Sequence, residues 1–159
     1  VLVKSALCSC RHRSIIADPI DPKMKDIVNT KIKFREEFRP FAPVVLEEHA
    51  RTYFPDFQTN LSAFMLATYN VSAKAKSIAS ATTHVDNTSR IQIVGKDYPG
   101  KYRRLLEVFY KKTKRPVLLN TSFNLKGEPI VETPDDARKT FLKSGLDILV
   151  VDNYILSKK

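Results

Sequence analysis

The second half of the chain alternates between helix-like and strand-like patterns, and this constrains the fold more than any other feature. Residues 102–113 carry an apolar stripe at helical spacing, with lysines collected in the last turn. A short apolar strand over 117–119 follows almost at once. A second helix begins at 133–136 (TPDD), and a buried strand over 146–151 ends the pattern. This order predicts an α/β (α+β) domain with a twisted mixed sheet flanked by helices.

The first half contains shorter patterns. Asp21 and Pro22 suit the start of a helix, with Asp as the cap and Pro in the first turn. The remaining expected elements are strands over 41–46, 63–70 and 89–94 and a short helix over 47–54. At 159 residues, the chain is long enough for one domain with a real core.

The chain is strongly basic. Lys and Arg number 27 and Asp and Glu 17, so the formal charge is 27 − 17 = +10. This charge favours anionic partners such as nucleotides, small phosphates, nucleic acid or an acidic protein surface. The lysines are dispersed and no aromatic–basic ribonucleoprotein signature occurs, which disfavours nucleic acid. No apolar run approaches the roughly 20 residues needed to span a bilayer, so no membrane is expected as a partner.

The cysteines and the first residues bear on the compartment. Cys8 and Cys10 are one residue apart, which favours free thiols over a disulfide or a zinc site. The start lacks an initiator Met and the order of a signal peptide. These features suggest a piece of a longer protein in a reducing, cytoplasmic compartment.

Small polar side chains gather directly after the strand over 117–119. Asn120, Thr121, Ser122 and Asn124 are all hydrogen-bonding groups, and such residues at the end of a strand often meet a ligand. If extended, Ser122 and Asn124 share a face, and both can donate to phosphate oxygens. An Asx-type turn is the simpler reading for Asn120 and Thr121.

A basic pair lies far upstream. On a strand, Lys33 and Arg35 would point to one side and form a clamp for a triphosphate, whereas on a helix their side chains would diverge. The competing reading is a solvated basic surface, because Glu36 and Glu37 follow directly and could pair with them.

Three further residues are possible ligands. His84, with Asp86 two residues on, could form a metal corner or an acid–base pair, but no third metal ligand is evident and a hydrogen-bonded loop is favoured. Arg90 and Arg13 could contact phosphate. Only four glycines occur and none forms a glycine-rich phosphate loop, which argues against P-loop and dinucleotide-binding folds.

In order and spacing, these segments resemble the carboxy-terminal domain of the nodulation-protein-U-type O-carbamoyltransferases. The segments that carry the resemblance are 13–19 (RSIIADP), 29–43 (NTKIKFREEFRPFAP), 83–86 (THVD), 90–92 (RIQ), 116–124 (PVLLNTSFN) and 127–131 (GEPIV).

The resemblance implies a single YrdC-like domain that binds ATP and carbamoyl phosphate and yields carbamoyl-adenylate. An actin-like domain on the amino-terminal side would then pass the carbamoyl group to a hydroxyl acceptor, and Mg2+ would accompany the ATP. The family hallmark corresponds to Lys33 with Arg35 and Ser122 with Asn124. The resemblance implies that Lys33, Arg35 and Ser122 are catalytic, and that the substrate contacts also include Asn120, Thr121, Asn124, Arg13, His84 and Arg90.

The opening of the chain departs from that family. Residues 4–14 lack the glycines of the family's loop, so residues 1–10 are expected to be an atypical start, open to disorder, before a domain over 11–159. Two alternatives therefore stay open: a nucleotide-binding fragment without catalytic activity, and a basic RNA-binding module of the same fold.

Overall fold

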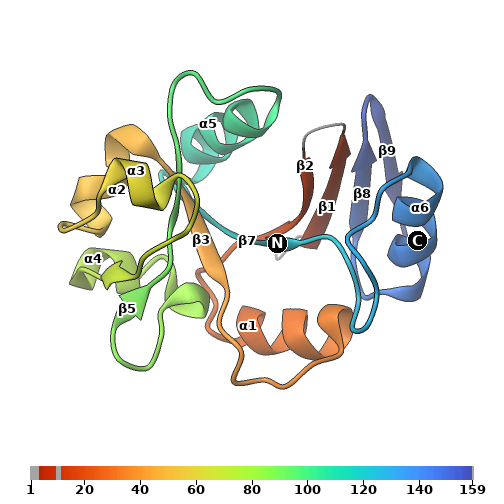
Figure 1. The fold of residues 1–159 in the computed structure, drawn as a ribbon, viewed down its shortest axis with the longest axis horizontal. Coiled ribbons are helices and arrows are strands. Elements are labelled where there is room, and N and C mark those ends of the chain that lie inside the picture. The colour runs from red at the N-terminus through yellow and green to blue at the C-terminus, as the bar shows by residue number, and fades with distance from the viewer. Residues whose placement is uncertain (1–3, 10–11, 159) are drawn as a thin grey trace.

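A seven-stranded mixed sheet organises the computed structural model, which describes residues 4–9 and 12–158 (Figure 1). The strands follow one another across the sheet in the order β6-β3-β7-β2-β1-β8-β9. Their bounds are β1 (Lys4–Ser9), β2 (His12–Ala17), β3 (Ala42–Leu46), β6 (Gln92–Val94), β7 (Val117–Ser122), β8 (Ile148–Val151) and β9 (Tyr154–Ser157). The pairs β1–β8 and β3–β6 are parallel and the other neighbours are antiparallel. The prediction of a mixed α/β domain is confirmed.

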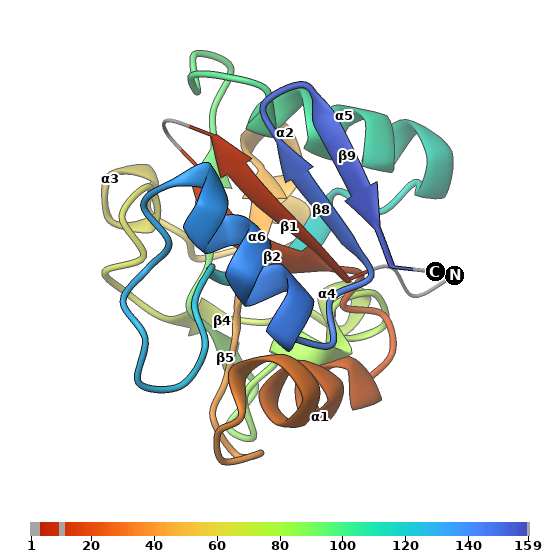
Figure 2. The same cartoon turned by 90° about the vertical axis from the view of Figure 1, so that its right-hand side faces the viewer.

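Short helices and a second, two-stranded sheet surround this sheet. The helices are α1 (Lys23–Val28), the π-helix η1 (Asn29–Lys33), α2 (Glu47–Tyr53), α3 (Thr59–Ser62), α4 (Ala73–Lys76), the 3-10 helix η2 (Ser80–Thr82), α5 (Tyr102–Thr113) and α6 (Pro134–Lys143). The small sheet pairs β4 (Tyr69–Asn70) with β5 (Thr88–Ser89). Figure 2 shows α6 lying across β1 and β8, which it contacts. Among the described residues, no helix has the length and apolar character to cross a membrane.

The alternation of side chains along the central strands gives the sheet two apolar faces. Leu118 of β7 packs with Ile16 of β2 under α5, where it meets Leu106. Leu119 points to the other face and packs with Ile15 and the residues of α1 and α6. Both faces of the central strands are therefore covered, which explains why the run over 117–119 is apolar throughout.

Two of the predicted strands differ from the structure. The stretch 63–70 was predicted as a strand, but it is mostly a turn in which Met65 adopts a left-handed conformation (φ 55°), and only Tyr69–Asn70 is extended. The strand expected over 89–94 is divided between β5 and β6. β5 pairs within the small sheet and β6 within the large one, so the strand is interrupted where the backbone passes from one sheet to the other. The alternation of side chains does not show where such a change of pairing partner occurs.

The opening segment was expected to be atypical and open to disorder. Instead, Lys4–Ser9 form β1, which pairs with β2 on one side and with β8 on the other. Hydrogen bonding to two neighbours, rather than a glycine-dependent turn, orders these residues. Cys8 lies in this strand, whereas Cys10 and Arg11 fall outside the described residues, as do residues 1–3 and 159.

Candidate functional site

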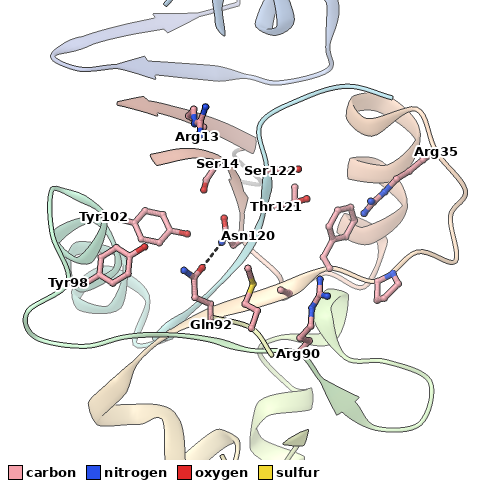
Figure 3. Close-up of a pocket in the computed structure, with 14 residues that line it drawn as sticks. Arg13, Ser14, Arg35, Arg90, Gln92, Tyr98, Tyr102, Asn120, Thr121 and Ser122 are labelled. Atoms are coloured by element: carbon pink, nitrogen blue, oxygen red, sulfur yellow. Dashed lines mark hydrogen bonds between the residues drawn. The ribbon is translucent and has the colours of Figure 1, made fainter. Parts of the chain in front are cut away.

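A cavity of about 480 Å³ opens beside the polar half of the sheet (Figure 3). Six of the nine residues that the sequence nominated as site residues line it: Arg13, Arg35, Arg90, Asn120, Thr121 and Ser122. They come from β2, from the loop after η1, from the segment between β5 and β6, and from β7. Residues that are far apart in the chain therefore meet at one place.

The floor of the cavity continues the face of the sheet that packs under α5. On β7, Asn120 lies two residues after Leu118 and so points to the same face. On β2, Ser14 stands in the same relation to Ile16. Each strand is apolar where α5 covers it and polar where α5 does not, which creates a hydrogen-bonding floor beside the core.

The structure adds eight lining residues that the sequence did not single out as site residues: Ser14, Pro40, Phe41, Ala42, Met65, Gln92, Tyr98 and Tyr102. Two signals could have pointed to some of them. Tyr98 lies four residues before Tyr102, the first residue of α5, and Gln92 is a polar residue within an apolar strand. Their proximity to Asn120 depends on sheet order, which the local pattern does not encode.

Arg35 is held rigidly at the cavity wall. Its Nε donates to Oδ1 of Asn29 at 2.8 Å, and its guanidinium carbon lies 4.7 Å from the centroid of the Phe41 ring. Asn29 is fully buried and also donates to the carbonyl oxygens of Glu37 and Arg39, so it ties the whole loop together. Burial and the neighbouring Arg39 lower the pKa of Arg35. A guanidinium stays protonated under such conditions, so Arg35 presents a fixed positive charge.

Lys33 does not line the cavity, and it is nearly buried, at 5% exposure. Its ammonium donates to Oγ of Ser122 at 3.2 Å and to Oδ1 of Asn124 at 2.6 Å, and it also contacts the carbonyl oxygens of both residues, at 2.8 and 3.1 Å. Burial, and next the charge of Arg35, lower its pKa to about 8. Lys33 is thus hydrogen-bonded to both Ser122 and Asn124, the second pair of residues that the sequence nominated.

Lys33 and Arg35 do not lie on a strand, so the alternative in which their side chains diverge applies. Lys33 ends the π-helix η1, and Phe34 adopts a left-handed conformation (φ 48°, ψ 47°) before Arg35 enters a loop. The reversal at Phe34 separates the directions of the two side chains, which alternation along a strand would have kept parallel. Lys33 therefore faces the end of β7, while Arg35 faces the cavity.

Asn124 completes the turn that follows β7. Its Oδ1 accepts from Oγ of Ser122 at 2.7 Å, and its Nδ2 donates to the carbonyl oxygen of Glu128 at 2.8 Å. Asn124 does not line the cavity, whereas Ser122 does. Asn124 accordingly orients the Ser122 hydroxyl and closes the turn.

His84 also lies outside the cavity lining and stabilises a loop. Its Nδ1 lies 3.1 Å from Oγ1 of Thr88, and Oδ1 of Asp86 accepts from the amide and the hydroxyl of Thr88. Burial is the main cause that lowers the pKa of His84. The charge of Asp86 raises this pKa, and the charge of Arg90 lowers it further. Within residues 4–9 and 12–158, no three His, Cys, Asp or Glu side chains form a possible metal site.

The cavity is cationic. Arg13, Arg35 and Arg90 line it, and Arg13 also donates to the carbonyl oxygen of Val131 at 3.3 Å. In the described part of the chain, no carboxylate lines the cavity and none forms an ion pair with these three arginines. Three guanidinium groups that form no ion pair with the described carboxylates are suited to an anionic ligand such as a phosphate.

Polar side chains cover the floor. Nδ2 of Asn120 donates to Oε1 of Gln92 at 2.8 Å, and Ser14, Tyr98 and Tyr102 line the same cavity. Burial raises the pKa of Tyr102 far above its usual range, so its hydroxyl stays protonated. Oδ1 of Asn120 is buried, and no group within residues 4–9 and 12–158 donates to it.

Comparison with known proteins agrees with the resemblance noted in the sequence. The family model described as the carbamoyltransferase C-terminus matches residues 6–158. This chain belongs to that family. The match begins inside β1, so the family's domain includes most of the segment whose glycines are missing.

Several rhizobial proteins are similar to this carbamoyltransferase C-terminal domain. Nodulation protein NolNO of Sinorhizobium fredii is 43% identical over 150 residues, which cover 93% of this chain and 22% of the relative. Nodulation protein NolO of Bradyrhizobium diazoefficiens is also 43% identical over 150 residues, which cover 93% of this chain and 27% of the relative. Nodulation protein U of the same species is 37% identical over 115 residues, 72% of this chain and 20% of the relative. The chain thus spans about a quarter of the length of such relatives.

Proposed function

We propose that the cavity binds ATP and carbamoyl phosphate and forms carbamoyl-adenylate for transfer to a hydroxyl acceptor. The observation that carries this proposal is the convergence of Arg13, Arg35 and Arg90 on one cavity whose described lining contains no carboxylate. Membership of the carbamoyltransferase C-terminus family supplies the reaction class. The cavity volume of about 480 Å³ lies within the usual range for a small-molecule site.

The reaction develops negative charge where the arginines lie. Water releases carbamate and inorganic phosphate from carbamoyl phosphate. A carbamate oxygen then attacks the α-phosphorus of ATP. The bond between the α-phosphorus and the oxygen that bridges to the β-phosphate breaks, and pyrophosphate leaves with the electron pair of that bond. Fixed guanidinium groups favour this step because they stabilise charge that grows in the transition state. The protein need only position the reactants, as in other phosphoryl-type transfers.

Lys33 would serve this chemistry indirectly. Its four contacts with Ser122 and Asn124 fix the turn at the end of β7, and Ser122 then presents its hydroxyl to the cavity. Such a contribution is positioning, in contrast to Arg35, which reaches the cavity itself. Asn124 would act in the same indirect way through Ser122.

Mg2+ would enter with the nucleotide. The described lining of the cavity offers hydroxyl and amide oxygens, from Ser14, Thr121 and Ser122 and from Asn120 and Gln92, but no carboxylate. This donor set suits an ion that is held mainly by ATP phosphates and water, which is the usual manner for Mg2+. Its charge would offset that of the triphosphate.

Transfer of the carbamoyl group would require more than this domain. Because the chain spans about a quarter of its relatives, we assign the acceptor site to the remainder of such a protein, in an actin-like domain on the amino-terminal side. The acceptor hydroxyl would be chosen there, and the present domain would supply the activated group.

The test uses two arginines that are four residues apart. Arg35 lines the cavity, whereas Arg39 is exposed and pairs with Glu36 at 2.8 Å. The purified chain is incubated with ATP, Mg2+ and carbamoyl phosphate, and pyrophosphate release is followed for the wild type, Arg35→Ala, Arg39→Ala and Ser122→Ala. We expect release that requires carbamoyl phosphate, that falls at least about 100-fold in Arg35→Ala and Ser122→Ala, and that persists in Arg39→Ala.

Two results would contradict the proposal in different ways. Binding of ATP without pyrophosphate release would limit this domain to holding the nucleotide. Absence of both binding and release would remove the nucleotide from the cavity altogether. Tight RNA binding that is unaffected by Arg35→Ala and falls steeply with salt would instead favour a basic RNA-binding module.

A further inference from the structure

We infer that Oδ1 of Asn120 is the acceptor that selects the amino group of the carbamoyl donor. The inference rests on the proposed function, because it concerns how the same cavity tells carbamoyl phosphate from other acyl phosphates. It assigns a specificity-determining role to a residue in the middle of the sheet, with Gln92 as its support.

The orientation of the Asn120 carboxamide is set by its neighbours. Its Nδ2 donates to Oε1 of Gln92 at 2.8 Å, and Gln92 is itself half-buried on β6. Figure 3 shows this contact as a dashed line, with the Asn120 oxygen directed away from Gln92. The amide nitrogen is thus occupied, and the oxygen is the free end of the group.

That oxygen is a buried acceptor that lacks a donor. Among residues 4–9 and 12–158, no group donates to it, although Asn120 lines the cavity. Buried polar atoms in proteins are almost always hydrogen-bonded, so an unpaired acceptor beside a cavity indicates that a donor arrives with a ligand. A ligand N–H at this position would satisfy Oδ1 while Nδ2 keeps its hydrogen bond to Gln92.

The surroundings of the acceptor match a planar amide. The hydroxyls of Ser14 and Tyr102 lie on the same floor, and each is able to donate. A carbamoyl group offers N–H donors on one side and a carbonyl acceptor on the other. Its NH2 would donate to Asn120, and its carbonyl oxygen would accept from a hydroxyl of the Ser14–Tyr102 pair.

The position of Asn120 in the sequence favours the carbamoyl group over the adenine base. The next two residues, Thr121 and Ser122, line the same cavity and carry the hydroxyls expected to meet phosphate. In carbamoyl phosphate, the amide and the phosphate share one bridging oxygen, so neighbouring positions on one strand can contact both. In ATP, the amino group of the base is separated from the phosphates by the rest of the base and the ribose.

Acetyl phosphate is the probe that isolates this contact, because a methyl group replaces the NH2 with little change in shape. The methyl group would leave the Asn120 oxygen unpaired, and sites built to bind an N–H reject ligands that lack it. Dissociation constants of both ligands are measured by calorimetry for the wild type, Asn120→Leu, Gln92→Leu and Asn70→Leu. Asn70 supplies the matched control, since it is exposed on β4 and bonds Asp56 outside the cavity.

We expect the wild type and Asn70→Leu to prefer carbamoyl phosphate by at least about tenfold, and Asn120→Leu to bring the two affinities within about twofold. Gln92→Leu should reduce the preference as well, because it frees the amide to rotate. It also serves as the second variant should Asn120→Leu fold poorly, which thermal unfolding would reveal.

The outcomes separate this inference from the proposed function. If Asn120→Leu and Gln92→Leu keep the wild-type preference, the inference is overturned while pyrophosphate release can still stand. If the variants lose selectivity for ATP over GTP and keep the preference for carbamoyl phosphate, the acceptor reads the base and the inference is overturned. If the wild type binds neither acyl phosphate, the proposed function and the inference fall together.

Discussion

Lys33 combines a buried ammonium with four oxygen contacts, an environment unlike that of a surface lysine. An ammonium has three protons, so the four oxygens share them. Loss of this group would leave the hydroxyl of Ser122 and the carboxamide of Asn124 to find other partners. The residue therefore couples the end of η1 to the end of β7, two elements that are distant in the chain.

The lowered pKa of Lys33 predicts a pH dependence of stability. The folded side chain releases its proton near pH 8, whereas the ordinary value is 10.5. Between these values the unfolded chain binds more protons than the folded one, so the contribution of Lys33 to the free energy of unfolding rises with pH. Urea denaturation of the wild type and of Lys33→Met should therefore diverge from pH 8 to pH 10, with the wild type gaining relative to the variant.

Two further measurements sharpen this prediction. Lys76→Met removes an exposed lysine of α4 that takes part in none of the ion pairs among the described residues, and its unfolding curves should stay parallel to those of the wild type over the same pH range. If Lys33→Met also stays parallel, the ammonium keeps an ordinary pKa and the description of its burial is wrong. Pyrophosphate release should be lost in Lys33→Met, because Ser122 loses the group that positions it.

At the scale of residues, the sequence identified most of the cationic site but not how it is assembled. The sequence left open whether Lys33 and Arg35 share a face or diverge, and they diverge because Lys33 ends a π-helix and a left-handed Phe34 follows it. Neither feature has a strong local signature, since each depends on the burial of Asn29 and on the loop that it anchors. Whether these residues bind ATP stays a prediction.

At the scale of elements, helix α6 begins with a capping box. Oγ1 of Thr133 accepts from the amide of Asp136 at 3.1 Å, and Oδ2 of Asp136 accepts from the amide of Thr133 at 3.0 Å. Thr133→Ala should lower the free energy of unfolding by about 1 kcal/mol. Urea denaturation would measure the loss, with Thr52→Ala, an exposed position on α2, as the control.

Thr52→Ala is the control that can contradict the prediction for Thr133→Ala. Thr52→Ala replaces the same side chain inside a helix, where alanine has the higher helix propensity, so no loss is expected. Equal losses in the two variants would show that removal of a threonine, and not of the cap, lowers stability.

Gly145 lies against the π-helix η1 at the end of α6. A Cβ at this position would meet the carbonyl oxygen of Lys31 at 2.8 Å, and the Gly145 amide already donates to that oxygen at 2.8 Å. Because backbone cannot move aside freely, Gly145→Ala should lower the free energy of unfolding by about 1–3 kcal/mol. It should also weaken pyrophosphate release, since η1 carries Lys33.

Gly95 provides the matched comparison for Gly145. A Cβ there would meet only the end of the Glu47 side chain, at 2.9 Å, which can turn away. Gly95→Ala should therefore change the midpoint of urea denaturation less than Gly145→Ala. A larger effect at Gly95 would contradict the picture of η1 packed against Gly145.

Some elements could be predicted because their signals are local. The apolar stripe over 102–113 and the TPDD start both correspond to helices in the structure, α5 and α6. β1 and β9 escaped prediction because their order comes from pairing with β8 rather than from their own side chains. The residues around Met65 were expected to be extended, but they form a turn that leads from α3 toward the small sheet.

At the scale of the whole molecule, a formal charge of +10 surrounds a site that already holds three arginines. The affinity for ATP should therefore fall several-fold as salt rises from about 0.1 M, where the screening length is about 10 Å, to about 1 M, where it is about 3 Å. Calorimetry with ATP and with adenosine would test this. An equal decline for uncharged adenosine would show that salt acts through something other than phosphate recognition.

The position of β1 in the sheet also has a consequence for how the protein is made. β1 lies between β2 and β8, so β8 and β9 join the remainder of the described sheet through it. During translation, β1 can form a hairpin with β2 early, but its other edge waits until the ribosome has produced β8. Such an open edge invites pairing with another chain. A chaperone should thus be most needed in the interval before β8 emerges, while β1 has paired with β2 alone.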